Sequence, residues 1–135
     1  MALAKQSAPV PVLLKVAPDL DEEAVEQIAE QVRACAFDGV IATNTTLSRD
    51  AVAGHRHAAE TGGLSGAPLT QRSVQVVAQF RRASPENMTL IGVGGISSED
   101  DALAMLNAGA QALQIYTSFI YQGTKLVRNL IDATK

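Results

Sequence analysis

The chain has 135 residues, 47% of them hydrophobic, and a net charge of −3. This length suits one domain with a sizeable core, and the hydrophobic share excludes a disordered chain. There is no basic run and no apolar stretch of membrane-spanning length, so we expect neither a nucleic-acid partner nor a membrane span. The first five residues lack the apolar core of a signal peptide, and a single cysteine is typical of a reducing compartment. The chain alone is therefore expected in the cytoplasm.

Residues 1–10 are expected to form a lead-in segment to one domain over residues 11–135. Pro11–Val16 is an apolar run interrupted by Lys15, and it predicts a buried strand. A helix over residues 22–36 is expected to follow, with Asp21 as its N-cap. Its inward face would hold Val25, Ile28, Ala29, Val32 and Cys35. We interpret Cys35 as a small core residue, with a reactive thiol as the alternative.

The next apolar run, Val40–Thr43, has no polar face, which is typical of a parallel strand covered on both sides. From residue 44 to about 69 no helix or strand is predicted, and such a long irregular segment in a compact domain is usually functional. A helix capped by Thr70 is predicted to run to about residue 82. Its inner face would hold Val74, Val77, Ala78 and Phe80.

Residues 89–93 predict a strand that ends at Gly94 and Gly95, where a helix begins at once. A strand, a glycine turn and the unpaired N–H groups of a helix N-terminus together form a common seat for an anion, most often phosphate. A plain tight turn is the alternative. Ser98 and Asp101 predict a capping box for this helix.

A fourth strand is predicted over residues 112–116, and the remaining residues to 135 are predicted to be helical. Thr117 and Ser118 follow that strand, so their hydroxyls would complete the anion seat. The order is a βα unit repeated four times, which predicts an α/β fold with a parallel sheet. Four units are half of a (β/α)8 barrel. A small doubly wound domain is the alternative, although the phosphate loop usual near its first strand is not found.

One lysine and one run of small polar residues lie near the ends of predicted strands, where ligands bind in parallel barrels. Lys15 lies inside an apolar strand, so its ammonium either faces an anionic ligand or ring, or reaches solvent from an edge strand. Thr43, Asn44, Thr45 and Thr46 are four consecutive small polar residues. They suit a planar ligand with alternating amide N–H and C=O groups, or they form an ordinary polar turn.

No metal site is predicted, because His55 and His57 have no cysteine or acidic cluster beside them and are better explained as solvated loop residues. No Ser-His-Asp set, Cys-His pair or carboxylate pair is apparent at the strand ends. Tyr116, at the end of the last strand, either stacks on a ligand or closes the core.

Five segments closely resemble, in order and spacing, the C-terminal half of dihydroorotate dehydrogenases of class 2, the membrane-associated, quinone-using type. They are Val12–Leu20, Asp38–Thr46, Thr61–Gly66, Ile91–Ile96 and Gln114–Thr117. The resemblance covers the chain from residue 9 onward. It implies the C-terminal half, about four βα units, of an FMN-binding (β/α)8 TIM barrel. That flavoprotein is an oxidoreductase, which oxidises dihydroorotate to orotate in pyrimidine (UMP) biosynthesis.

The resemblance also implies roles for individual residues. Lys15 matches the lysine near the N1–C2=O region of the flavin, and Thr43 matches a flavin-contacting threonine. Asn44 and Thr45 match residues that hydrogen-bond the pyrimidine substrate. The remaining FMN-binding positions are Gly66 and Gly95, whose backbones approach FMN, and Tyr116 and Thr117, which help to hold its phosphate.

Two departures from the family pattern qualify these expectations. The family's N-terminal half lies outside this chain, and with it the serine base, further asparagines and the quinone entry and membrane contact. The catalytic base is therefore expected elsewhere, and the chain alone is expected to be inactive. Gly123, Thr124 and Lys125 stand where the family usually has glycine followed by prolines. The alternative is a non-catalytic half-barrel that binds phosphate, FMN, a second copy of itself or an N-terminal half-barrel.

Overall fold

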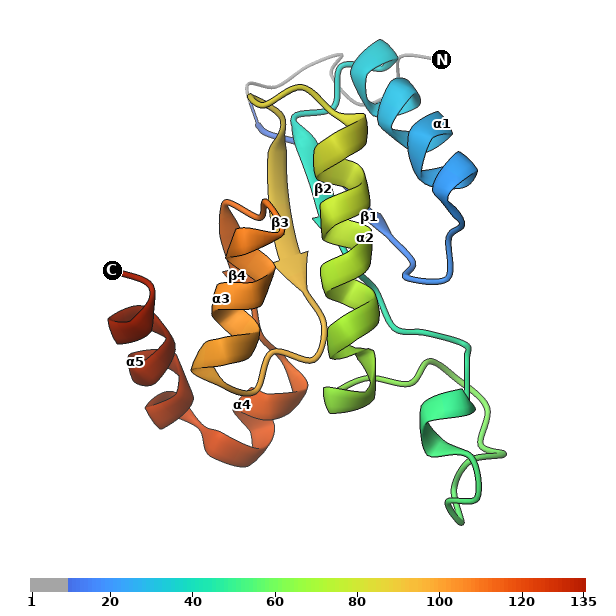
Figure 1. Cartoon of the computed structure of the whole chain (residues 1–135), viewed down its shortest axis with the longest axis vertical. Helices are drawn as coiled ribbons and strands as arrows, with labels where there is room; N and C mark the ends of the chain where they lie inside the picture. The colour runs from blue at the N-terminus through green and yellow to red at the C-terminus, as the bar shows by residue number, and fades with distance from the viewer. Residues whose placement is uncertain (1–9) are drawn as a thin grey trace.

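The computed structural model describes residues 10–135, so residues 1–9 of the predicted lead-in lie outside the described residues. Four parallel strands form one sheet in the order β1 (Leu13–Val16), β2 (Gly39–Ala42), β3 (Thr89–Val93) and β4 (Ala112–Gln114) (Figure 1). Consecutive strands are connected through α1 (Glu22–Ala34), α2 (Thr70–Ala83) and α3 (Glu99–Asn107). Two further helices follow β4, namely α4 (Thr117–Gln122) and α5 (Thr124–Ala133). The predicted α/β fold of four βα units is confirmed.

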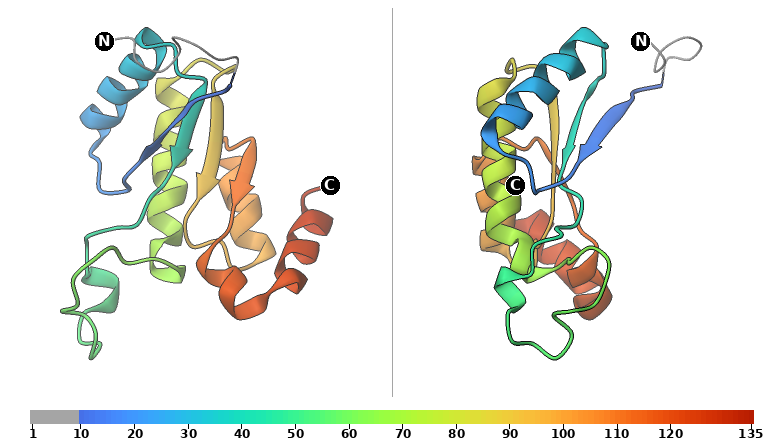
Figure 2. Two further views of the ribbon diagram at one scale, coloured as in Figure 1. Left: turned by 180° about the vertical axis from the view of Figure 1, so that it is seen from behind. Right: turned by 90° about the vertical axis from the view of Figure 1, so that its right-hand side faces the viewer.

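The core lies between the sheet and one layer of helices. Figure 2 shows α1 and α2 against the same face of the sheet. Side chains alternate between the two faces of a strand, so every second residue points into this layer. The fully buried core residues include Val40, Leu90, Phe80 and Met105. On α2, the predicted Val77 and Phe80 are buried and the predicted Val74 packs against the core. Ser73 and Val76 are also fully buried, so the predicted inner face of this helix is incomplete.

The opposite face of the sheet has no helix against it within residues 10–135. The strand register places Lys15, Ile41 and Ile91 side by side on this face. Lys15 is exposed, and both isoleucines are only partly buried. The prediction that the second strand is covered on both sides is therefore wrong for the described residues. The sheet also ends at β1 and β4 as its outer strands.

The helix boundaries follow from local capping. Asp21 accepts a hydrogen bond from the Ala24 N–H at 2.8 Å, which confirms it as the N-cap of α1. Ser98 and Asp101 form the predicted capping box at the start of α3. Thr70 is not a cap, because its hydroxyl donates to the carbonyls of Ala67 and Gly95 instead. Cys35 is half-buried at the C-terminal end of α1.

Two predicted elements have different boundaries in the structure. The fourth strand ends at Gln114 rather than at Tyr116. The C-terminal helix is divided in two at Gly123, whose φ of 60° and ψ of −151° interrupt the helical backbone. No helix in the described part of the chain is both long and apolar enough to cross a membrane.

The long segment between β2 and α2 contains only two short 3₁₀ helices, η1 (Asp50–Val52) and η2 (Ala67–Leu69). It extends past the carboxyl ends of the strands (Figure 1). Thr46 and Leu64 close its base with a two-way bridge: the Thr46 N–H donates to the Leu64 carbonyl at 3.1 Å, and the Leu64 N–H donates back at 2.8 Å.

Candidate functional site

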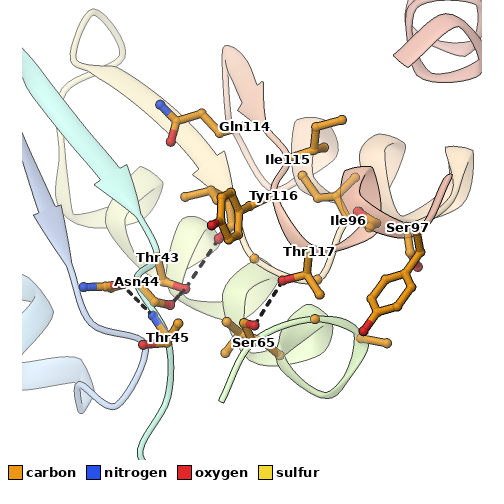
Figure 3. A pocket seen from close by; sticks show the side chains of 18 of the residues that line it. Thr43, Asn44, Thr45, Ser65, Ile96, Ser97, Gln114, Ile115, Tyr116 and Thr117 are labelled. Carbon is orange, nitrogen blue, oxygen red and sulfur yellow. Dashed lines mark hydrogen bonds between the residues drawn. The ribbon is translucent and has the colours of Figure 1, made fainter. Parts of the chain in front are cut away.

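All eight residues predicted to bind a cofactor or substrate line one cavity of about 520 Å³. The cavity lies at the carboxyl ends of the strands, and Figure 3 shows the ends of β2 and β4 contributing to it from two sides. The eight are Lys15, Thr43, Asn44, Thr45, Gly66, Gly95, Tyr116 and Thr117. Leu69, Val93 and Ile96 supply apolar wall. A concave, largely apolar site with a few convergent polar groups is typical of a small-molecule site.

Lys15 is the only charged residue among the described residues that line this cavity. It belongs to the edge strand β1 and points to the uncovered face of the sheet. Lys15 is exposed within residues 10–135. Its position nevertheless brings a cation to the rim of the cavity, where it would favour an anionic or electron-rich ligand.

Thr43 is buried where β2 leaves the sheet, and its hydroxyl contacts two parts of the fold. The Thr43 Oγ1 atom lies 3.0 Å from the Ser73 Oγ atom of α2 and donates to the Asn44 carbonyl at 3.0 Å. The Asn44 N–H donates to the Val16 carbonyl at 2.6 Å, and the Asn44 side chain accepts from the Thr45 N–H at 2.9 Å. The side-chain Nδ2 atom of Asn44 and the hydroxyl of Thr45 donate no hydrogen bond to the described residues. They therefore remain available to a ligand.

The turn formed by Gly94 and Gly95 packs directly on the start of α2. A Cβ atom on Gly94 would lie 2.2 Å from the Ser73 Oγ, and one on Gly95 would lie 2.2 Å from the Thr70 Oγ1. Both glycines have positive φ, 127° and 76°. The space that their side chains would take is filled by α2, while both glycines line the cavity. The turn needs glycine because helix and turn approach closely.

At the start of α3, where the sequence predicts an anion site, the Asp101 carboxylate takes up main-chain N–H groups. Its Oδ2 atom accepts hydrogen bonds from the N–H groups of Ser97 and Ser98 at 2.9 and 3.0 Å. The Asp101 N–H in turn donates to the Ser98 hydroxyl. These three N–H groups are therefore paired within the capping box, so an anion bound at this turn would need other donors. Burial raises the pKa of Asp101, but the hydrogen bonds from Ser97 and Ser98 lower it below its usual value.

The other side of the cavity is formed by hydroxyl groups of two distant segments. The Thr117 Oγ1 atom donates to the Ser65 Oγ at 3.0 Å (Figure 3). A Cβ on Gly66 would lie 3.3 Å from the Thr117 methyl group, so Gly66 and Thr117 are in contact. Ser118 donates to the Ile96 carbonyl, which fastens α4 to the glycine turn. Tyr116 is 75% exposed and does not close the core of the described residues.

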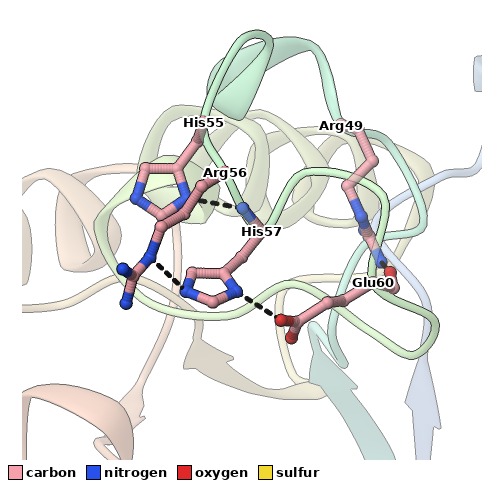
Figure 4. Close-up of polar contacts among 5 residues, drawn as sticks. All are labelled: Arg49, His55, Arg56, His57 and Glu60. Atoms are coloured by element: carbon pink, nitrogen blue, oxygen red, sulfur yellow. Dashed lines mark hydrogen bonds and ion pairs between the residues drawn. The ribbon is translucent and has the colours of Figure 1, made fainter.

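The irregular segment beyond this cavity is held together by Arg49. Its guanidinium donates to the carbonyls of Thr46, Leu47, Ser48, Glu60 and Gly62, which lie on both arms of the segment. His55 and His57 are exposed near its tip, and His57 pairs with Glu60 (Figure 4). Within residues 10–135, no three His, Cys, Asp or Glu side chains are grouped to hold a metal ion.

Sequence reasoning missed residues that act through tertiary contacts. Ser73 reads as one polar residue of an amphipathic helix, but it is fully buried beside Thr43. Asp19 follows β1 and accepts hydrogen bonds from Thr46 and Leu47. The sequence carries no signal for these contacts, because the partners are far apart along the chain. Ser73 lies 30 residues from Thr43, and Asp19 lies 27 residues from Thr46 and 28 from Leu47.

The parallel βα units and the cavity at the carboxyl ends of their strands define a small-molecule-binding domain of the (β/α) class. The family model described as dihydroorotate dehydrogenase matches residues 1–135. The chain belongs to the dihydroorotate dehydrogenase family.

Relatives and solved structures agree with this assignment. The dihydroorotate dehydrogenases (quinone) of Shewanella baltica and Shewanella oneidensis are each 52% identical to this chain over 124 residues, which are 92% of the chain and 37% of each relative. A crystal structure of DHODH from Eimeria tenella in complex with ferulenol matches with a TM-score of 0.83 and 37% identity, over 90% of this chain and 32% of that one. The ligand-free form gives a TM-score of 0.84. The chain thus spans about a third of the length of these relatives.

Proposed function

We propose that this chain is the FMN- and substrate-binding part of a quinone-dependent dihydroorotate dehydrogenase, which oxidises dihydroorotate to orotate in de novo pyrimidine biosynthesis. The observation that carries the proposal is that the residues matched to FMN and pyrimidine contacts all line one cavity. They come from five separate regions of the sequence. An unrelated ligand would not require this combination of a lysine, an Asn-Thr pair and two glycine segments.

The residues of the cavity fit FMN. The apolar wall of Leu69, Val93 and Ile96 suits a flat ring system, and the Lys15 ammonium at the rim suits the electron-rich side of that ring. The hydroxyls of Ser65 and Thr117 meet where a phosphate would be held. Bound FMN would supply a hydride acceptor. Asn44 and Thr45 would orient the pyrimidine by hydrogen bonds to its amide groups.

The remaining parts of the activity are assigned to residues outside this chain. The family resemblance assigns to that region the serine that takes the C5 proton of the substrate, the quinone entry and the peripheral contact with the inner membrane. The uncovered face of the sheet, with Lys15, Ile41 and Ile91, would pack against the remainder of the barrel. No metal and no nucleic acid take part in this proposal.

A second candidate function is a non-catalytic half-barrel. The uncovered sheet face and the two outer strands favour it, because such surfaces associate with a second copy or with another chain. In that case the cavity would bind FMN or phosphate without turnover.

Expression of residues 1–135 alone, and again with the N-terminal part of the Shewanella baltica relative, separates these functions. Dye reduction by dihydroorotate should appear only when the two parts are expressed together. FMN binding without turnover in both preparations would favour the non-catalytic half-barrel. Robust turnover by residues 1–135 alone would contradict the proposal, because proton abstraction would then need a base within this chain.

A further inference from the structure

We infer that Asp19 is a positioning residue for the substrate-facing pair Asn44 and Thr45. This inference rests on the proposed function, in which that pair binds the pyrimidine. Asp19 lies in the loop between β1 and α1, whereas the pair lies at the end of β2. The contact therefore joins two neighbouring βα units at the carboxyl edge of the sheet.

Asp19 holds the two residues that directly follow Thr45. Its Oδ1 atom accepts from the Thr46 hydroxyl at 2.5 Å, and its Oδ2 atom accepts from the Leu47 N–H at 2.8 Å. Thr46 is 7% exposed. Because one carboxylate fixes both a side chain and a backbone group, the segment cannot rotate or shift without breaking a charge-assisted hydrogen bond.

The loop that carries Asp19 is itself fastened to α2. The Arg72 Nε atom donates to the Pro18 carbonyl at 2.8 Å, and its Nη2 atom donates to the Leu20 carbonyl. These carbonyls flank Asp19 on either side. The carboxylate is therefore held at a fixed place and cannot follow the Asn44–Leu47 segment if that segment moves.

The Asn44–Thr45 pair is anchored before and after, and the Thr46–Leu64 bridge shares the second anchor with Asp19. The Asn44 N–H is bonded to the Val16 carbonyl before the pair, and Asp19 holds the chain after it. Between these points the Thr45 side chain packs on Gly63, where a Cβ atom would lie 1.9 Å from the Thr45 Oγ1. Removing the Asp19 carboxylate leaves the second anchor to the main-chain bonds between Thr46 and Leu64. The Thr46 side chain and the Leu47 N–H are then released, so the Asn44 side-chain amide and the Thr45 hydroxyl lose part of their fixed orientation toward the cavity.

The first test is titration of orotate into the chain complemented with the N-terminal part of the Shewanella baltica relative. Asp19→Ala should weaken orotate binding at least tenfold and leave the FMN content unchanged. Asp19→Asn should give an intermediate loss, because its amide oxygen accepts from Thr46 while its amide nitrogen cannot accept from Leu47. Unchanged orotate affinity in Asp19→Ala would overturn the inference.

Asp21→Ala is the matched control, since Asp21 is an exposed carboxylate two residues away that caps α1 instead. It should lower the thermal midpoint without changing orotate affinity. An equal loss of affinity in both variants would mean that loop destabilisation, not positioning, is responsible, and would also overturn the inference.

A second measurement separates this inference from the proposed function. Hydrogen exchange of the Leu47 amide in residues 1–135 should be at least tenfold faster in Asp19→Ala and unchanged in Asp21→Ala. If the complemented wild-type protein binds no orotate, the proposed function fails, and the exchange result alone decides whether Asp19 holds the segment. Unchanged Leu47 exchange in Asp19→Ala would show that it does not.

Discussion

The hydroxyl of Ser73, in the first turn of α2, lies 3.0 Å from the hydroxyl of Thr43, at the end of β2. Ser73 is fully buried, and its Oγ atom also occupies the place of a Cβ on Gly94. One buried oxygen thus contacts two of the segments that line the cavity. The start of α2 is therefore a support for the site as well as part of the core.

We predict that Ser73→Ala lowers the free energy of unfolding by about 1 kcal/mol, because Thr43 loses a buried hydrogen-bond partner. In the chain complemented with the N-terminal part of the Shewanella baltica relative, Ser73→Ala should also lower the amount of FMN retained. Urea unfolding and flavin content measure the two effects. Ser84→Ala is the control, because the Ser84 hydroxyl is buried without a partner among the described residues and its removal should cost little. Equal effects of the two variants would contradict this role of Ser73.

Gly95→Ala should destabilise the fold by about 2–3 kcal/mol, because its Cβ would collide with Thr70 in addition to straining a positive φ. Gly123→Ala shares the positive φ but would meet no atom within 4 Å. The difference between the two unfolding free energies therefore isolates the collision. A Gly95→Ala protein that loses FMN with an unchanged unfolding midpoint would show that this position faces the ligand and not α2.

Asp101→Ala should cost about 1 kcal/mol of stability at neutral pH, because the capping box is lost. The pKa of Asp101 is lowered in the folded protein, so its contribution is fully present above its usual value of 3.8 and is lost as the pH falls through the folded pKa. Unfolding measured between pH 7 and pH 2.5 should show the wild type and the variant converging in acid. Asp100→Ala, in the same helical turn but outside the capping box, is the control for the loss of a negative charge. If the difference in unfolding free energy between wild type and Asp101→Ala stays constant from pH 7 to pH 2.5, the ionised Asp101 carboxylate is not the source of the stabilisation.

Lys15→Ala in the complemented protein should slow flavin reduction by dihydroorotate about 100-fold, because the cation near the ring is lost. Lys15 is not part of the buried core of the described residues, so the unfolding midpoint of residues 1–135 alone should hardly change. Stopped-flow absorbance measures the reduction step. Lys125→Ala, on α5 and outside the residues that line the cavity, is the control for a general loss of positive charge. Reduction at the wild-type rate would leave Lys15 as a solvated edge lysine.

Asn44→Ala should weaken orotate binding about tenfold, because pyrimidine polar groups would be left unpaired at a cost of about 1–3 kcal/mol. FMN should remain bound. Isothermal titration of orotate checks the first effect, and the flavin absorbance checks the second. Asn107→Ala, at the exposed end of α3, provides an asparagine control. If Asn44→Ala binds orotate as tightly as the wild type, the Thr43–Thr46 segment is an ordinary polar turn.

Much of the fold could be predicted because its signals are local. The apolar runs before Asp21 and around Val40, and the capping box at Ser98, each specify an element through neighbouring residues. Lys15 and the Thr43–Thr46 run could be placed at one edge because the ends of parallel strands meet there, whereas Gly66 and the individual roles came from the resemblance to the family. What failed depended on contacts between distant residues. Thr70 is predicted as a cap, but its hydroxyl donates to the Gly95 carbonyl. Ser73 is predicted as an ordinary polar residue of α2, but it is fully buried beside Thr43.

The hydrogen bonds of the Arg49 guanidinium all go to main-chain carbonyls. Carbonyl groups are present whatever side chains accompany them, so the shape of this loop is insensitive to the identity of most residues within it. Positions 51–59 therefore offer a place where a short peptide tag, a fluorophore or an extra few residues can be inserted. Such an insertion point would allow the cavity to be followed by fluorescence without altering any residue that lines it.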